Sequence, residues 1–135
     1  MTLRILIADD NEMVRRGVAR VLSSEASWDV CGEAKDGGEA LLKAKELTPD
    51  LILLDISMPG MNGLEVARRL RQDSHDAKIL ILSQNDAGPL KPHAIAAGAD
   101  GCVDKGRMCT DLLAAIKQID LKPCGDRTAG GEPDS

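Results

Sequence analysis

Short apolar runs alternate with amphipathic segments along most of the chain. Residues 3–8 form an apolar run that ends at two acidic residues, which suits a strand buried on both faces. Residues 13–22 repeat apolar positions at three- and four-residue steps, which indicates an amphipathic helix with Arg15, Arg16 and Arg20 on its other faces. The predicted core stripe of this helix is Met13, Val14, Gly17, Val18, Val21 and Leu22.

The same alternation continues to about residue 119. The further elements it predicts are a strand over residues 28–34, a helix from the glycine pair 37–38 to before Pro49, a strand over residues 51–54, a helix after an Asn62-Gly63 turn, a strand over residues 79–82, a short helix from near Pro92 to Gly98, a strand over residues 100–103, and a helix with the stripe Leu112, Leu113, Ile116 and Ile119. A proline is tolerated in the first turn of a helix and a glycine often ends one. The segment of residues 85–91, rich in Gly and Pro, is the expected mobile loop.

This order of elements predicts an α/β fold. Parallel strands need crossover connections, which are almost always right-handed, so we expect a doubly wound, five-stranded parallel sheet between two layers made by five helices. We take the strand order as 2-1-3-4-5, which places the first and third strands side by side. At 135 residues the chain fits one domain, residues 1–120, and the Gly-, Pro- and charge-rich residues 121–135 are expected to be a disordered tail.

Polar side chains stand at the carboxyl ends of the predicted strands. They are Asp9 and Asp10 after the first strand, Asp55 after the third, Ser83 after the fourth and Lys105 after the fifth. In an open parallel sheet these ends meet at one crevice. A carboxylate pair about 4 Å apart costs on the order of 4 kcal/mol at an effective dielectric near 20, and a hard cation such as Mg²⁺ offsets that repulsion. The pattern therefore indicates a magnesium site for phosphoryl transfer, while the alternative remains that Asp9 and Asp10 cap a helix and Asp55 lies in a solvated loop.

Four segments carry a specific resemblance: LIADDNEMVRRG, LILLDISMPGMNGLE, ILS and AGADGCVDK. In this order and spacing they resemble the response regulator receiver domain family of two-component signalling, over about residues 3 to 119. The resemblance implies a flavodoxin-like fold with Asp55 as the phosphoacceptor and Mg²⁺ held by Asp9, Asp10, Asp55 and the Ser57 backbone carbonyl. It also implies that Ser83 is the switch hydroxyl and Lys105 the pairing lysine, in a signalling receiver that catalyses only its own phosphorylation and dephosphorylation.

The resemblance also implies partners. The phosphoryl donor would be a sensor histidine kinase or a phosphotransfer protein, and the face of the fourth helix, fifth strand and fifth helix would contact an output domain, a partner protein or a second copy in a phosphorylation-dependent homodimer. The segments look closest to receivers that precede helix-turn-helix output domains. Two positions depart from the common pattern: Cys102 stands where many receivers carry a switching Tyr or Phe, and Gly106 follows Lys105 where many have proline.

Composition narrows the remaining possibilities. The formal charge of −5 disfavours direct nucleic-acid binding by this chain, and its apolar runs are too short to span a membrane, so we expect a cytoplasmic protein. Its single aromatic residue, Trp28, and the lack of a G-x-G-x-x-G motif disfavour a flavodoxin-like cofactor binder. An aspartyl phosphatase would carry an acid/base carboxylate at the position of Ser57. A receiver-like module that is never phosphorylated also remains open.

Overall fold

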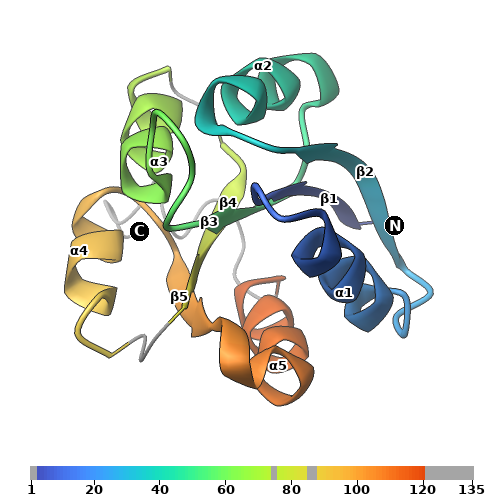
Figure 1. Ribbon diagram of the computed structural model, residues 1–135. Coiled ribbons are helices and arrows are strands. Elements are labelled where there is room, and N and C mark those ends of the chain that lie inside the picture. Colours follow the sequence, from blue (N-terminus) through green and yellow to red (C-terminus); the bar gives the residue numbers. More distant parts are fainter. Residues whose placement is uncertain (1–2, 74–75, 85–87, 121–135) are drawn as a thin grey trace, which may run out of the picture.

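The computed structural model describes the backbone of residues 3–73, 76–84 and 88–120, and the side chains of all of these except 108–110 and 120. Within this part of the chain, five parallel strands form one sheet in the order β2-β1-β3-β4-β5 (Figure 1). The strands are β1 (Leu3–Ala8), β2 (Trp28–Ala34), β3 (Leu51–Asp55), β4 (Lys78–Ser83) and β5 (Gly101–Asp104). The predicted α/β architecture and strand order are confirmed.

Helices cover both faces of this sheet. In chain order they are α1 (Glu12–Leu22), α2 (Gly37–Leu47), α3 (Gly63–Gln72), α4 (Lys91–Ala96) and α5 (Met108–Asp120), with a short 3₁₀ turn, η1 (Lys105–Arg107), before the last. One face carries α2, α3 and α4, and the other carries α1 and α5 (Figure 1). Among the described helices, none is both long enough and apolar enough to cross a membrane.

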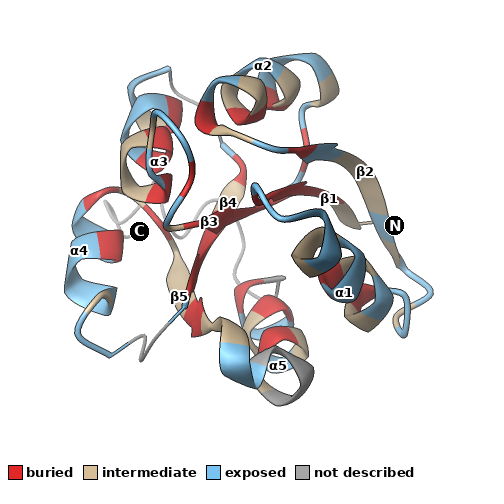
Figure 2. Ribbon diagram, viewed as in Figure 1, coloured by how far each residue is buried: buried red, intermediate tan, exposed pale blue. Residues whose placement is uncertain are grey.

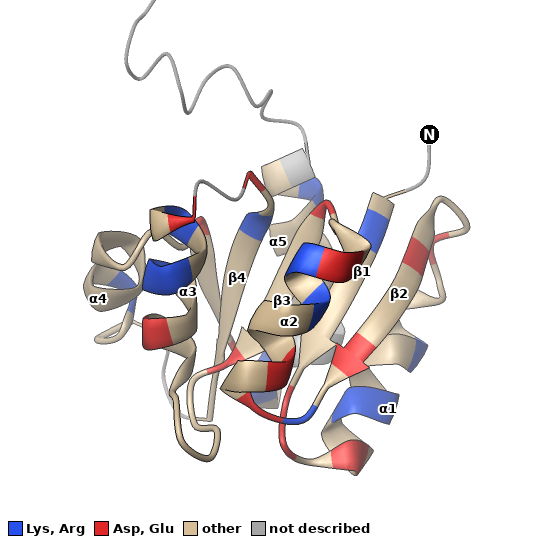
Figure 3. Cartoon of the chain, turned by 90° about the horizontal axis from the view of Figure 1, so that it is seen from above, with Lys and Arg blue, Asp and Glu red and all other residues tan. Residues whose placement is uncertain are grey.

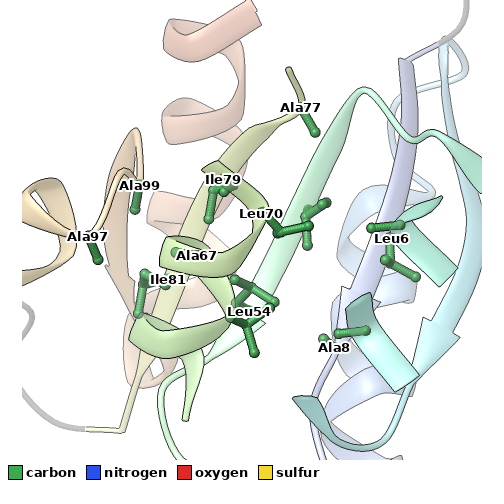
Figure 4. Packing of buried hydrophobic residues seen from close by; sticks show 14 of the residues in the cluster. Leu6, Ala8, Leu54, Ala67, Leu70, Ala77, Ile79, Ile81, Ala97 and Ala99 are labelled. Atoms are coloured by element: carbon green, nitrogen blue, oxygen red, sulfur yellow. The ribbon is translucent and has the colours of Figure 1, made fainter. Parts of the chain in front are cut away.

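The central strands supply the buried core, as the red strands of Figure 2 show. Alternate residues of a strand point to opposite faces, so Leu6, Leu54 and Ile81 pack under α2, α3 and α4. Figure 4 shows this layer, in which small alanines of α3 and α4 allow close approach to the sheet. Ile7 and Leu53 pack on the other face, against α1 and α5. Both core layers end at the same edge of the sheet, which is where the polar residues begin.

Polar side chains fix the starts of three helices. The side-chain oxygens of Asn11, Asp36 and Asn62 accept hydrogen bonds from backbone N–H groups in the first turns of α1, α2 and α3. The Asn62-Gly63 pair was expected to form a turn before the third helix, but Asn62 is the cap and Gly63 the first helical residue. At this position an added Cβ would lie 2.5 Å from the carbonyl oxygen of Asp55, so only glycine fits.

The end of the sheet follows its prediction closely. α4 begins one residue before Pro92, and its chain reverses at Gly98, which has a φ of +101°. β5 runs one residue later than predicted, since its pairing with β4 begins at Gly101, opposite Leu80, and ends at Asp104, opposite Ser83. The predicted disordered tail, residues 121–135, and residues 85–87 of the predicted mobile loop lie outside the described residues.

The orientation of α1 differs from its prediction at three residues. Met13 and Gly17 were placed in the core stripe, but Met13 is 79% exposed, and Gly17 is also exposed, with open space where a Cβ would lie. Met13 lies about 100° around the helix from Val14, and Val14, Val18 and Leu22 are the row that faces the sheet. Arg15 was placed on an outer face, yet its side chain is 15% exposed because it turns toward the end of β1.

Candidate functional site

Three carboxylates meet where β1 and β3 end. The register pairs Ala8 of β1 with Leu54 of β3. The residues that follow this pair, Asp9 and Asp55, therefore lie side by side. Each of Asp9, Asp10 and Asp55 offers an oxygen within 4.8 Å of the others. Figure 3 shows acidic segments at the strand ends along the lower edge of the sheet in that view. The predicted convergence of the three aspartates is therefore present in the fold.

Asp9 is the fixed member of this cluster. It is fully buried, and its backbone N–H donates to the carbonyl of Ala34 at 2.9 Å. Its carboxylate oxygen Oδ1 accepts from the N–H of Asn11 at 2.9 Å, and its backbone carbonyl accepts from Nη1 of Arg15 at 2.6 Å. Asp10, in contrast, is exposed. The cluster thus joins a rigid carboxylate to one at the mouth of the site.

Asp55 is also fully buried, but only one of its oxygens is engaged. Oδ1 accepts from the N–H of Ser57 at 3.2 Å and lies 3.0 Å from Nζ of Lys105. Among the described residues, the second oxygen, Oδ2, has no hydrogen-bond partner. Nζ of Lys105 also lies 2.7 Å from Oδ2 of Asp9, as an ion pair without hydrogen-bond geometry. One ammonium therefore bridges two buried carboxylates and leaves an oxygen of Asp55 available.

Burial and nearby charges shift the pKa values of Asp55 and Lys105. Burial raises the pKa of Asp55, and the nearby charge of Asp9 adds to that effect, although the hydrogen bond from Lys105 opposes it. Burial alone would lower the pKa of Lys105, but its contacts with Asp9 and Asp55 together raise it. Lys105 is therefore a permanent cation in the site at neutral pH, while an ionised Asp55 is not fully compensated.

The site fits a hard divalent cation. The converging groups are carboxylate oxygens, which Mg²⁺ prefers, and one ammonium does not neutralise three carboxylates. The unpartnered Oδ2 of buried Asp55 is a polar atom that needs a further partner. Ser57, whose backbone carbonyl was predicted to complete the metal ligands, is exposed and follows Asp55 by two residues. Its role as a ligand stays a prediction.

Ser83 closes the site from β4. It is the last residue of that strand and is 4% exposed. Its side chain lies near the thiol of Cys102 on β5, which shares its face of the sheet because Ile81 pairs with Cys102. Cys102 is half-buried, and burial raises the pKa of its thiol. The residue that replaces the common aromatic ring is thus a direct neighbour of the predicted switch hydroxyl.

The alternative reading of the aspartates is wrong. Asn11, not Asp9 or Asp10, caps α1, and Asp55 is buried at a strand end instead of lying in a solvated loop. Sequence reasoning missed two contributors to the site: Asn11, which also holds Asp9, and Arg15. Asn11 could have been found from its place directly before an amphipathic helix. Arg15 gave no comparable signal.

Comparison with known proteins assigns the family. The sequence pattern of the response regulator receiver domain matches residues 5–117, and the chain belongs to this family. It is a signalling receiver of two-component systems, which removes the alternatives of a flavodoxin-like cofactor binder and of an aspartyl phosphatase.

Particular relatives agree with this assignment. The chain is 36% identical to the response regulator GacA of Pseudomonas viridiflava over 87% of its own length and 55% of that protein. It is 34% identical to UvrY of Escherichia coli, of which it covers 54%. Among solved structures, the receiver domain of NarL from Mycobacterium tuberculosis superposes with a TM-score of 0.83 at 34% identity, over 90% of this chain and 98% of that one. A LuxR-family response regulator from Aurantimonas superposes with a TM-score of 0.83 at 36% identity, over 88% of this chain and 85% of that one. The chain spans about half the length of the curated relatives it matches.

Proposed function

We propose that Asp55 accepts a phosphoryl group from a phosphohistidine and that the resulting aspartyl phosphate switches the domain. The observation that carries this proposal is the buried carboxylate of Asp55, which has one oxygen held by Lys105 and Ser57 and one without a partner. A held carboxylate with a free oxygen is suited to in-line attack on phosphorus.

The transfer step balances with the groups present. Oδ2 of Asp55 forms a bond to phosphorus as the bond between phosphorus and the donor imidazole breaks, and the imidazole keeps that electron pair and takes up a proton. The Lys105 ammonium, already within 3.0 Å of Asp55, meets the charge on the phosphoryl oxygens. Water that attacks phosphorus later releases inorganic phosphate and restores the carboxylate.

Asp9, Asp10, Asp55 and the backbone carbonyl of Ser57 would hold Mg²⁺ in this site. When bound, the ion supplies positive charge that offsets the carboxylate repulsion and the charge of the phosphoryl group. The protein's own contribution is to keep Asp9 in place through Ala34 and Asn11.

Switching would come from Ser83 and Lys105. A phosphoryl group brings roughly −1.5 to −2 charges, and a charge-assisted hydrogen bond to it is worth about 1.5–3 kcal/mol. Moving an equilibrium from 1:99 to 99:1 needs about 5.5 kcal/mol. Lys105 already pairs with Asp55, so its bond to the phosphoryl group replaces an existing one. Ser83, buried at the end of β4, would gain a charge-assisted hydrogen bond to the phosphoryl group, so it would carry most of the difference.

The partners follow from the same chemistry and from the relatives. The donor would be a sensor histidine kinase or a phosphotransfer protein. The face made by α4, β5 and α5 would contact an output domain, a partner protein or a second copy, as in a regulator of transcription. No direct contact of this chain with nucleic acid is proposed.

Intact-mass spectrometry after incubation with acetyl phosphate and Mg²⁺ tests the phosphoacceptor. We expect one labile phosphoryl group per chain in the wild type and none in Asp55→Asn. Asp73→Asn, which changes an exposed aspartate at the end of α3, is the matched control and should be labelled like the wild type. Labelling of Asp55→Asn would place the phosphoryl group on another residue and contradict the assignment. An unlabelled wild type would also contradict it and would favour a receiver-like module that is never phosphorylated.

A further inference from the structure

Arg15 joins three elements around the acidic cluster. Its Nη1 donates to the backbone carbonyl of Asp9 at 2.6 Å, and its Nε lies 2.8 Å from Oε1 of Glu33 on β2. The Arg15 side chain is 15% exposed, whereas that of the next residue, Arg16, is 75% exposed and pairs with Glu12 within α1. Two adjacent arginines on one helix therefore have different surroundings.

The carbonyl that Arg15 contacts belongs to the peptide bond between Asp9 and Asp10. A peptide unit is planar, so fixing the direction of its oxygen fixes the plane that joins the two α-carbons. The orientation of Asp10 relative to Asp9 then depends less on the rest of the loop. This matters because Asp10 is exposed, and the part of the chain that the structure describes gives its carboxylate no hydrogen bond or ion pair.

The frame that holds Arg15 is the sheet itself. Glu33 lies in β2 directly across from Ile7 of β1, and the next residue, Ala34, accepts the N–H of Asp9. Arg15 thus contacts the backbone of Asp9 and the side chain of Glu33 on β2 through two donors of one planar guanidinium. The single ammonium of a lysine cannot reproduce this geometry. Glu33 also balances the charge of Arg15, so the bridge adds no net charge beside the acidic cluster.

We propose that Arg15 is a positioning residue that sets the Asp9–Asp10 peptide for divalent-cation binding. This inference rests on the proposed function, since it concerns the same acidic cluster. Residues that orient metal ligands typically change metal affinity by about 10- to 100-fold when they are removed. Among the interactions found in the described residues, Arg15 makes no contact with the carboxylates of Asp9, Asp10 or Asp55, so it acts on them through the backbone.

Isothermal titration calorimetry with Mg²⁺ alone tests the proposal without any phosphoryl transfer. Arg15→Met keeps most of the apolar stem and removes both N–H contacts, and we expect it to bind Mg²⁺ about 10- to 100-fold more weakly than the wild type. The Mg²⁺ affinity of Arg15→Lys should lie between those of the wild type and Arg15→Met. Arg16→Met is the matched control and should bind like the wild type. The melting temperature of each variant in EDTA shows whether it is folded.

The outcomes separate the two proposals. Wild-type Mg²⁺ affinity in folded Arg15→Met overturns the role of Arg15 and leaves the phosphoacceptor assignment intact. If Arg15→Met does not fold, Arg15→Lys decides: affinity below the wild type supports the role, and wild-type affinity overturns it. A wild type that binds no Mg²⁺ overturns the metal site itself, and with it the role of Arg15.

Discussion

Lys105 Nζ lies 3.0 Å from Oδ1 of Asp55, so the cation that would meet a phosphoryl group is already paired with the carboxylate that would carry it. A contact that exists in both states cannot distinguish them. The preference for an active state must come from groups whose partners change, and we expect the hydroxyl of Ser83, at the end of β4, to be such a group.

Ser83→Ala should separate labelling from switching. We expect the variant to accept a phosphoryl group at Asp55 but to lose about 1.5–3 kcal/mol of preference for the active state, which is roughly a 10- to 150-fold smaller population ratio. NMR shifts of β5 amides with and without acetyl phosphate would measure the response. Ser27→Ala, at an exposed serine before β2, is the control. A full response in Ser83→Ala would assign the switch to another group.

The raised pKa of Asp55 predicts how stability depends on pH. Burial favours the protonated carboxyl more in the folded than in the unfolded chain, so this stabilisation is complete below the ordinary aspartate pKa and is lost as pH rises through the raised value. Asp55→Asn does not titrate. In EDTA it should therefore melt at a higher temperature than the wild type at neutral pH, and the difference should shrink toward about pH 4.

Thermal denaturation across this pH range measures the effect. Asp73→Asn, at an exposed position, should show a difference from the wild type that hardly varies with pH. An Asp55→Asn protein that melts below the wild type at neutral pH would mean that the Lys105 ion pair outweighs the cost of burying the carboxylate.

The close packing of Gly63 against the backbone of Asp55 links the stability of the fold to the phosphoacceptor position. In Gly63→Ala the new Cβ would lie 2.5 Å from the carbonyl oxygen of Asp55 and 3.2 Å from the α-carbon of Ile56. Relieving this clash requires the backbone to move, which costs more energy than moving the end of a side chain. We therefore expect a loss of about 1–3 kcal/mol or more in the free energy of unfolding. Urea denaturation measures it, and labelling at Asp55 should slow as well.

Gly38→Ala is the control for that substitution. Gly38 lies in the first turn of α2, and its nearest neighbour, Oδ1 of Asp36, would be 3.6 Å from an added Cβ. Alanine is favoured over glycine in a helix, so this variant should be as stable as the wild type or more so by up to about 1 kcal/mol. Equal losses for the two variants would show that the contact with Asp55 has no special cost.

Strand ends were predictable because burial dictates them. The runs that precede Asp9, Asp55 and Ser83 are almost entirely apolar, so each strand ends where a polar side chain begins. The parallel arrangement then places these residues at one edge. α4 was predictable within a residue or two, since Pro92 and Gly98 limit where a helix begins and ends.

Contacts that depend on docking between elements were not predictable. Periodicity gives the apolar row of α1 only to within about one residue, so it could not distinguish partly buried Arg15 from exposed Arg16, or exclude Met13 from the core. The neighbourhood of Ser83 and Cys102 depends on the register between β4 and β5, which no pattern within either strand specifies.

The need for a divalent cation tests the acidic cluster most directly. Wild-type protein is incubated with acetyl phosphate, once with Mg²⁺ and once with EDTA, and the fraction carrying a phosphoryl group is followed by intact mass. Because Asp9, Asp10 and Asp55 converge around one ammonium, labelling should require the ion and should be lost in Asp10→Asn at low Mg²⁺. Labelling at the same rate in EDTA would contradict the site as described.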